Sequence, residues 1–229
     1  MNVLVAVAHP DDEGLGAGGT IARLVKAGYI VDCLILSGGV DARTRRPSDP
    51  ELDADISVAK NILGIRNLVL GDFPNIKLNT VAHSDLTQFI EKHIKEYQSQ
   101  IIFTHHPGDL NDDHGFVSRA CMAASRLWQR QPGILPLKEL YFMEILSSTE
   151  WGFPGHNALF QPDTFVELSE SDLLTKIKSI DAYRNVMREV PHPRSPEVLT
   201  ANARLRGSQS NYVYAEAFMR AYGGISILD

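Results

Sequence analysis

The hydrophobic pattern of the chain alternates between short apolar runs and longer amphipathic segments. The first run, Val3–Ala8, contains only apolar residues, which is typical of a strand buried on both faces. Residues 14–28 then carry apolar side chains at helical spacing, and Ile30–Leu36 is a second apolar run. The same patterns predict further strands at 68–70, 101–103, 140–143 and 164–168, and further helices at 51–63, 85–97, 115–129, 170–187 and 195–206.

This alternation predicts an α/β fold. Strand–helix–strand units form parallel pairs through right-handed crossovers, so we expect a Rossmann-like, mostly parallel sheet with helices on both faces, in a single domain over 1–229. The loops that follow parallel strands meet at one edge of such a sheet. Gly64 is expected to end one helix and Ser84 to cap the next. The irregular stretch 145–163 is interpreted as a substrate-side loop and not as a domain boundary.

Composition narrows the class of protein. The 229 residues carry a net charge of -6, which argues against nucleic acid or an anionic membrane as the main partner. No apolar stretch approaches the roughly 20 residues that span a bilayer, and no secretory signal opens the sequence. The two cysteines, Cys33 and Cys121, lie in apolar patterns typical of buried thiols in a reducing cytoplasm. A cytoplasmic location is therefore expected.

An imidazole and three consecutive acids follow the first strand directly, as His9-Pro10-Asp11-Asp12-Glu13. Packing gives no reason to place three mutually repelling carboxylates there. A divalent cation does, because it neutralises their charge and takes imidazole and carboxylate as ligands. The alternative interpretation is a solvated acidic loop in which Asp11 or Asp12 caps the following helix.

A second polar segment follows the strand at 101–103. Residues 104–114 (THHPGDLNDDH) hold three histidines and three acids, and a helix is expected to begin immediately afterwards. The positive end of that helix would favour a neutral His114, which is the form that binds metal. Turn and cap roles for Asp109, Asn111 and Asp113 are the alternative. Because both polar segments are expected at the same edge of the sheet, a shared metal site is the favoured interpretation.

Three protein ligands with an open fourth position are typical of a catalytic zinc site. We expect His9, Asp12 and His114 to be the ligands of one divalent ion, with zinc favoured and iron(II) or another divalent metal also compatible. Asp11 lies next to a ligand and would accept a proton from the activated water, then deliver it to a leaving amine. This arrangement is suited to hydrolysis of an amide.

The segment 8–13 (AHPDDE), together with 109–114 (DLNDDH), resembles the PIG-L/LmbE-like de-N-acetylases. Members of that family act on N-acetylglucosamine (GlcNAc) joined to phosphatidylinositol, inositol, malate or another sugar. Weaker matches lie at 191–195, 206–207 and 214–218. The resemblance implies a hydrolase whose partner is a small N-acetylated sugar or sugar conjugate. It leaves the aglycone and the oligomeric state open, and a homo-oligomer is compatible with it.

The resemblance also implies roles for single residues. His9, Asp12 and His114 would bind zinc, and Asp11 would be the general base. An arginine after the second strand and an acid after the third would hold sugar hydroxyls, and Arg43 and Asp72 match these positions. Because the alignment of that loop is open, Arg45 or Arg46 are alternatives to Arg43.

One departure from the family pattern affects the stabilisation of the tetrahedral oxyanion. Many members have a histidine three positions before the last ligand, where this chain has Asn111. Asparagine donates a hydrogen bond but carries no positive charge. We therefore expect His192 to share this role, with an exposed loop residue between two prolines as the alternative.

Three other functions match parts of the same sequence. Residues 14–19 fit the dinucleotide pattern G-x-G-x-x-G, but acids precede the first glycine and the second strand ends in Ser37-Gly38-Gly39 without an acid. Two histidines and one carboxylate also match iron(II) oxygenases, which by analogy usually have a β jelly roll. A non-catalytic sugar-binding relative is the third alternative, and the presence of Asp11 weighs against it.

Overall fold

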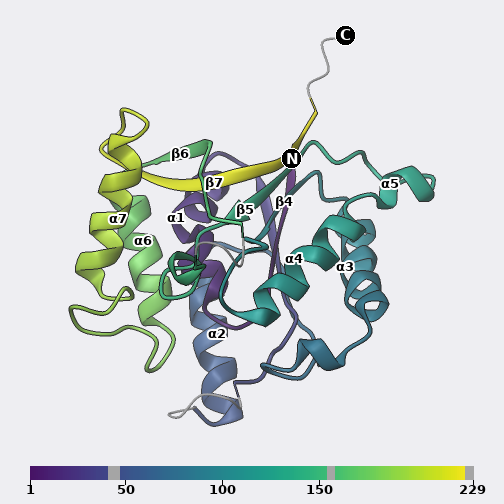
Figure 1. Ribbon diagram of the computed structural model, residues 1–229, viewed down its shortest axis with the longest axis horizontal. Coiled ribbons are helices and arrows are strands. Elements are labelled where there is room, and N and C mark those ends of the chain that lie inside the picture. The colour runs from purple at the N-terminus through teal and green to yellow at the C-terminus, as the bar shows by residue number, and fades with distance from the viewer. Residues whose placement is uncertain (41–46, 154–157, 225–229) are drawn as a thin grey trace.

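The computed structural model describes residues 1–40, 47–153 and 158–224. Within them seven strands form one sheet, in the order β3-β2-β1-β4-β5-β7-β6 (Figure 1). The strands are β1 (Asn2–Val7), β2 (Ile30–Ile35), β3 (Leu68–Leu70), β4 (Ile101–His105), β5 (Glu139–Met143), β6 (Thr164–Leu168) and β7 (Tyr214–Gly223).

The sheet is mostly parallel, as the sequence predicts. β1 pairs in parallel with β2 and β4, and the parallel pairing continues to β3 on one side and to β5 on the other. β7 is antiparallel to both β5 and β6 and lies between them. This strand was not among the expected elements. It is built partly from alanine and glycine, which have low strand propensity, and only its first half is buried.

Helices cover both faces of the sheet (Figure 1). The alternation of side chains along β1 sends Val3, Val5 and Val7 into one core cluster and Leu4 and Ala6 into the other. The first cluster lies under α1 (Asp12–Lys26), α2 (Asp49–Leu63), α6 (Glu170–Asp181) and α7 (Pro196–Ser208). The second lies under α3 (His83–Tyr97), α4 (Asp112–Ala124) and α5 (Leu127–Arg130).

Several helix ends differ from those expected. α3 begins at His83 after Ala82, so Ser84 lies inside its first turn and is not the cap. α4 begins at Asp112, because the side chain of Asn111 accepts a hydrogen bond from the Asp113 backbone and caps the helix there. The helix expected over 170–187 ends at Asp181, and the residues beyond it fold toward a cavity described below.

Other features of the expected fold are present. Gly64 ends α2 with a φ of 75°, in the left-handed region that favours glycine. Short 3-10 helices, η1 (Leu78–Thr80) and η2 (Thr149–Trp151), lie in the connections. Among the described residues, no helix combines the length and apolarity that crossing a bilayer requires.

The strand order fixes where a ligand site can form. From β1 the chain winds toward β2 and β3, and it returns through β4 to wind toward β5 in the opposite direction. The loops that follow β1 and β4 therefore separate at their carboxyl ends and leave a crevice, which is where open α/β sheets bind ligands. The two polar segments of the sequence, 9–13 and 106–114, both lie at this point.

Close backbone approach at Gly71 provides a test of this packing. A Cβ added there would lie 2.3 Å from the Leu36 carbonyl oxygen, which is a backbone atom of the neighbouring chain segment. We expect Gly71→Ala to lower the free energy of unfolding by about 1–3 kcal/mol, measured by urea denaturation. Gly115→Ala is the matched control, since its nearest atom would be 3.8 Å away and alanine favours the helix. Equal losses in the two variants would contradict this account.

Candidate metal centre

The turn between β1 and α1 positions the first two residues of the centre. Asp11 has a φ of 102°, which is unusual for a residue other than glycine, and its backbone N–H donates to Glu13 Oε2 at 3.2 Å. The His9 backbone N–H donates to Asp12 Oδ2 at 2.9 Å. The first turn of α1 is therefore tied to the end of β1, and His9 and Asp12 are fixed relative to one another.

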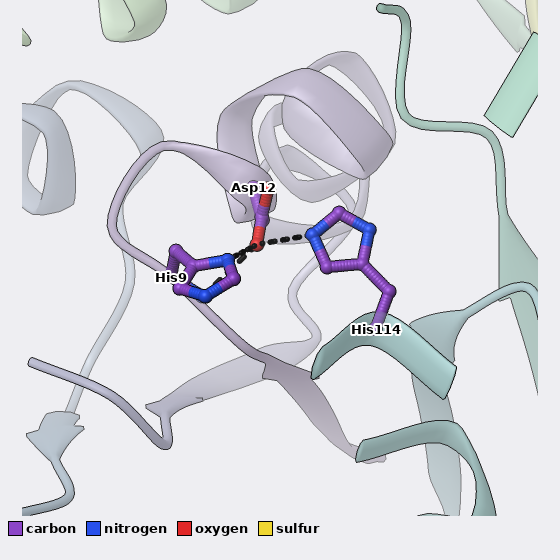
Figure 2. A group of neighbouring side chains, drawn as sticks. All are labelled: His9, Asp12 and His114. Atoms are coloured by element: carbon purple, nitrogen blue, oxygen red, sulfur yellow. Dashed lines mark hydrogen bonds and ion pairs between the residues drawn. The ribbon is translucent and has the colours of Figure 1, made fainter. Parts of the chain in front are cut away.

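His114 approaches from the opposite side of the crevice. It lies in the first turn of α4, whose start is fixed by the Asn111 cap. Figure 2 shows the two imidazoles pointing toward the carboxylate of Asp12. Asp12 Oδ2 lies 3.4 Å from His9 Nδ1 and 3.3 Å from His114 Nε2. One ligand atom from each of these three residues lies within 4.8 Å of the others, which makes them a group able to hold a metal ion.

Each imidazole has a second carboxylate behind it. His9 Nε2 lies 2.9 Å from Asp113 Oδ2, and Asp113 also accepts a hydrogen bond from the Leu78 backbone at 3.0 Å. His114 Nδ1 lies 3.1 Å from Asp109 Oδ1. Carboxylates that hold the outer nitrogen of a histidine are characteristic of metal sites, because they fix the ring and leave the inner nitrogen for the ion.

Asp109 is itself held by several donors. The Ser148 hydroxyl donates to its Oδ1, the Thr149 hydroxyl donates to Oδ2 at 2.6 Å, and the Asn111 backbone donates to Oδ1 at 2.8 Å. Burial disfavours the charged form, yet these donors and His114 lower the Asp109 pKa to about 2. Asp109 is therefore an anion at neutral pH and stabilises positive charge at His114.

The electrostatics of the three central residues favour a cation. Burial disfavours the charged form of each. It is outweighed at His114, where Asp12 and Asp109 raise the pKa to about 10. The two carboxylates thus also outweigh the helix end, which was expected to favour a neutral ring. It is outweighed at His9 too, where Asp113 and Asp12 raise the pKa. His114 and His9 in turn hold the Asp12 pKa well below its usual range. The cluster thus stabilises positive charge between its carboxylates, as a site for a divalent ion requires.

His105 lies against the cluster without belonging to it. Its ring stacks on His114 with centroids 3.8 Å apart, and its Nε2 accepts a hydrogen bond from the Ala8 backbone at 2.8 Å. Burial and the neighbouring His114 lower its pKa to about 3, so the ring is neutral. Because the lone pair of Nε2 is engaged by Ala8, this nitrogen is not available as a ligand. His105 instead holds the His114 ring in place by packing.

A cavity of about 1000 Å³ opens directly over the three residues. Asp11 lines it, and Asp11 Oδ2 lies 3.3 Å from Arg194 Nη1. Arg194 also donates through Nε to the Ser147 hydroxyl at 2.7 Å, which fixes its guanidinium beside the carboxylate. The side walls are lined by amides, apolar side chains and a second arginine, namely Asn75, Ile76, Asn79, Leu110, Asn111, Asn185 and Arg188.

The other residues singled out in the sequence lie in different places. Asn111 lines the cavity, with its Oδ1 engaged in the helix cap and its Nδ2 left as a donor. His192 is not among the lining residues; its Nδ1 accepts a hydrogen bond from the Arg194 backbone at 3.0 Å. Asp72 is exposed and also does not line the cavity, although Asn75, Ile76 and Asn79 of the same connection do.

Arg43, with its alternatives Arg45 and Arg46, lies outside the residues that the structure describes. From the sequence, no catalytic or binding role was expected for Arg194, Arg188 or Glu13. Glu13 is fully buried, its Oε1 accepts a hydrogen bond from the Tyr183 hydroxyl at 2.6 Å, and burial raises its pKa to about 7. Glu13 could have been noticed from the sequence, because it is a charged residue that directly follows Asp12. For Arg194 the signal was its place in the weaker family match at 191–195, which does not separate it from the neighbouring His192.

The sequence matches a known family over the part that builds this centre. Residues 4–125, more than half of the chain, match the sequence model of the PIG-L family, described as GlcNAc-PI de-N-acetylase. The chain belongs to this family. The matched range includes all three residues of the central cluster and the carboxylates behind them. Deacetylation of an amide is thus the activity of the family to which the centre belongs.

Two proteins similar in sequence to this chain are named as deacetylases. An uncharacterised deacetylase of Escherichia coli K12, YaiS, is 30% identical over 135 residues, which cover 54% of this chain and 68% of the relative. A protein of Bacillus anthracis, named as a probable N-acetyl-alpha-D-glucosaminyl L-malate deacetylase 2, is 28% identical over 134 residues. This second match covers 54% of the chain but only 58% of the relative.

Solved structures share the fold over nearly the whole length. The conserved protein TT1542 of Thermus thermophilus superposes with a TM-score of 0.79 at 25% identity, covering 98% of this chain and 96% of the other. GalB of Pseudomonas putida KT2440, a 4-carboxy-2-hydroxymuconate hydratase, gives 0.75 at 22% identity, covering 100% and 99%. At 22% identity the likeness shows the fold alone, and a hydratase with this fold indicates that the fold supports more than one reaction.

The carboxylate behind His114 generates a direct test of the centre. We expect Asp109→Asn to weaken Zn²⁺ binding by about 10–100-fold, because the neutral amide no longer orients and polarises the imidazole. A competition titration with a chromophoric chelator measures this affinity. Asp72→Asn removes a carboxylate outside the cavity and is the matched control, with unchanged affinity. An unaltered affinity in the Asp109 variant would contradict the role assigned to that carboxylate.

Proposed function

We propose that this PIG-L protein is a metal-dependent hydrolase that removes the acetyl group from an N-acetylated amino sugar of the GlcNAc type, or from its conjugate. The observation that carries the proposal is the convergence of His9, Asp12 and His114, each imidazole held from behind by a carboxylate, beside the uncoordinated Asp11. Zinc is the proposed ion, since it takes histidine and carboxylate ligands in open catalytic sites. Iron(II) would fit the same ligands.

His9 Nδ1, Asp12 Oδ2 and His114 Nε2 are the atoms that would hold the ion. When bound, a divalent ion supplies Lewis acidity and lowers the pKa of water within its reach. Asp11 then acts as the general base, taking a proton from the attacking water, and afterwards as the general acid that protonates the leaving amine. Arg194 Nη1 lies 3.3 Å from Asp11 Oδ2 and would hold the carboxylate in place for both steps.

Two residues are proposed to stabilise the oxyanion of the tetrahedral state. Asn111 is the stronger of them, because its amide lines the cavity and the helix cap orients the Nδ2 donor. His192 would contribute only if its turn moved toward the cavity. Burial and the nearby Arg194 and Arg188 lower its pKa, so it would donate as a neutral imidazole.

The size and charge of the cavity support this substrate class. A volume of about 1000 Å³ is at the upper end of the range for small-molecule sites and leaves room for a sugar with a second group attached. Arg188 lines the wall, and its guanidinium has no hydrogen bond or ion pair with any described residue. We propose that it binds a carboxylate or phosphate on the aglycone. The malate named for the Bacillus anthracis relative would supply such a group.

Other assignments belong to the same proposal. The iron oxygenase alternative rested on the two histidines and one carboxylate, and the α/β fold weighs against it because such oxygenases usually have a β jelly roll. The dinucleotide alternative is disfavoured because Lys176 and Glu216 side chains pack on the glycine-rich segment that suggested it. Cys33 and Cys121 are both buried free thiols, which supports the cytoplasmic location expected from the sequence. Metal analysis of the purified protein, combined with an oxygen-consumption assay, separates the hydrolase from an oxygenase.

The proposed base is tested by Asp11→Asn. We expect turnover to fall by at least about 100-fold while the bound metal is retained, because the amide cannot accept a proton and does not belong to the ligand group. The measurements are acetate released from a panel of N-acetylated sugars and sugar conjugates, and metal content by elemental analysis. His114→Ala is the comparison variant and should lose metal as well as activity. Near-normal turnover in the Asp11 variant would show that another group is the base.

The proposed anion site is tested by Arg188→Gln. We expect KM to rise about 10-fold or more for an N-acetylglucosaminide that carries a carboxylate, because a charged hydrogen bond is lost, and to stay unchanged for a neutral N-acetylglucosaminide. Arg204→Gln changes the net charge equally at an exposed position of α7 away from the cavity, and serves as the control. Equal KM changes for the charged and the neutral substrate would rule out anion recognition by Arg188.

A further inference from the structure

α1 is interrupted at Ala17, which has a non-helical φ of -141° and ψ of 18°. The interruption separates the first turn, which carries Asp12 and Glu13, from the rest of the helix. In a regular helix the N–H of residue 19 would donate to the carbonyl of residue 15. At this break, the Leu15 carbonyl instead accepts from Lys176 Nζ at 2.8 Å, and the Gly19 N–H donates to Glu216 Oε1 at 3.0 Å.

The two side chains complete the broken helix as one unit. Lys176 Nζ also donates to Glu216 Oε1 at 2.6 Å, and the second oxygen, Oε2, accepts the Thr20 N–H at 2.6 Å. Lys176 comes from α6 and Glu216 from β7, and both side chains are about nine-tenths buried. Lys176 Nζ and both oxygens of Glu216 form hydrogen bonds, and these bonds make the burial of the two charges tolerable.

The glycines of α1 make this insertion sterically feasible. A Cβ at Gly18 would lie 3.1 Å from Lys176 Cγ, and a Cβ at Gly14 would lie 3.1 Å from Ser179 Oγ. Residues 12–19 of α1 include four glycines, which give this part of the helix little intrinsic stability. Its direction therefore depends on the elements that pack against it. Gly14 and Gly18 therefore allow α6 to pack closely on α1.

One face of α6, continued by the turn after it, packs against the N-terminal part of α1. Lys176, Ser179 and Ile180 follow helical spacing, and Tyr183 continues it to donate its hydroxyl to Glu13. This face thus reaches from the break at Ala17 to the residue next to Asp12. The direction of the first turn is set from outside α1.

We propose that Lys176 and Glu216 are positioning residues: by completing the break in α1, they set the direction of its first turn and hence the place of the Asp12 carboxylate between the two imidazoles. The inference rests on the metal site proposed above. It assigns to the pair a role beyond stability, since the pair touches neither the cavity lining nor the three central residues in the described part of the chain.

The test is the double variant Lys176→Met/Glu216→Gln, which removes both charges together and so leaves neither buried without a partner. We expect a folded protein with a lowered melting temperature, because the Leu15 carbonyl and one of the two α1 N–H groups lose their partners. In it we expect Zn²⁺ affinity lowered by about 10-fold or more, a changed visible spectrum of the Co²⁺-substituted protein, and a reduced kcat with KM little altered. Chelator competition, absorption spectroscopy and acetate release measure these quantities.

The matched control is Arg206→Met/Glu144→Gln, which removes a largely buried ion pair that joins α7 to the end of β5 and does not contact α1. It should leave the Co²⁺ spectrum and Zn²⁺ affinity unchanged. Should the first double variant not fold, Glu216→Gln alone carries the test, because it retains one oxygen acceptor for the backbone of α1.

The outcomes separate the two proposals. A parent protein that binds no Zn²⁺ would overturn the metal site itself, and the positioning role with it. A parent that binds Zn²⁺, together with a folded Lys176→Met/Glu216→Gln variant of equal affinity, spectrum and kcat, would overturn the positioning role alone.

Discussion

The burial of charged side chains determines how this centre is arranged. Asp12, Asp109 and Asp113 are all buried, and each would be strongly destabilising without a partner. His9 and His114 provide those partners, and each imidazole lies between two carboxylates. Neither ring is free to rotate, because both of its nitrogens face a carboxylate oxygen. A cation entering such a cluster finds its ligands already oriented, which is the condition for efficient electrostatic catalysis.

The sheet topology makes this charge cluster possible. The residues that form it come from two segments separated by about a hundred positions, and only the adjacency of β1 and β4 brings their ends together. Because both strands are buried on both faces, a shift in their register would move side chains from one core cluster into the other, so the packing of the two clusters fixes the register. The precision of the centre is thus inherited from the packing of the sheet beneath it.

The sequence predicts the parallel sheet and the meeting of His9, Asp12 and His114, because buried strands and acids that packing cannot explain are both visible in the pattern of residues. It does not predict which carboxylate stands behind which imidazole. That pairing, Asp113 with His9 and Asp109 with His114, depends on side-chain directions within two turns. The place of β7 and the break in α1 are not predicted either. β7 is placed by its antiparallel pairing with β5 and β6, and the break in α1 is completed by Lys176 and Glu216, which are distant in the sequence.

The cavity is lined by the centre itself and by walls that come from other parts of the molecule. Its walls come from the connections after β3 and β4 and from the turn between α6 and α7, which contribute Asn75, Ile76, Asn79, Leu110 and Arg188. The three central residues belong instead to the ends of core elements. Evolution can therefore lengthen, shorten or recharge the walls while the reactive centre stays intact. Changes in the connecting segments could therefore alter which acylated molecule fits the cavity, while the fold and the central residues stay the same.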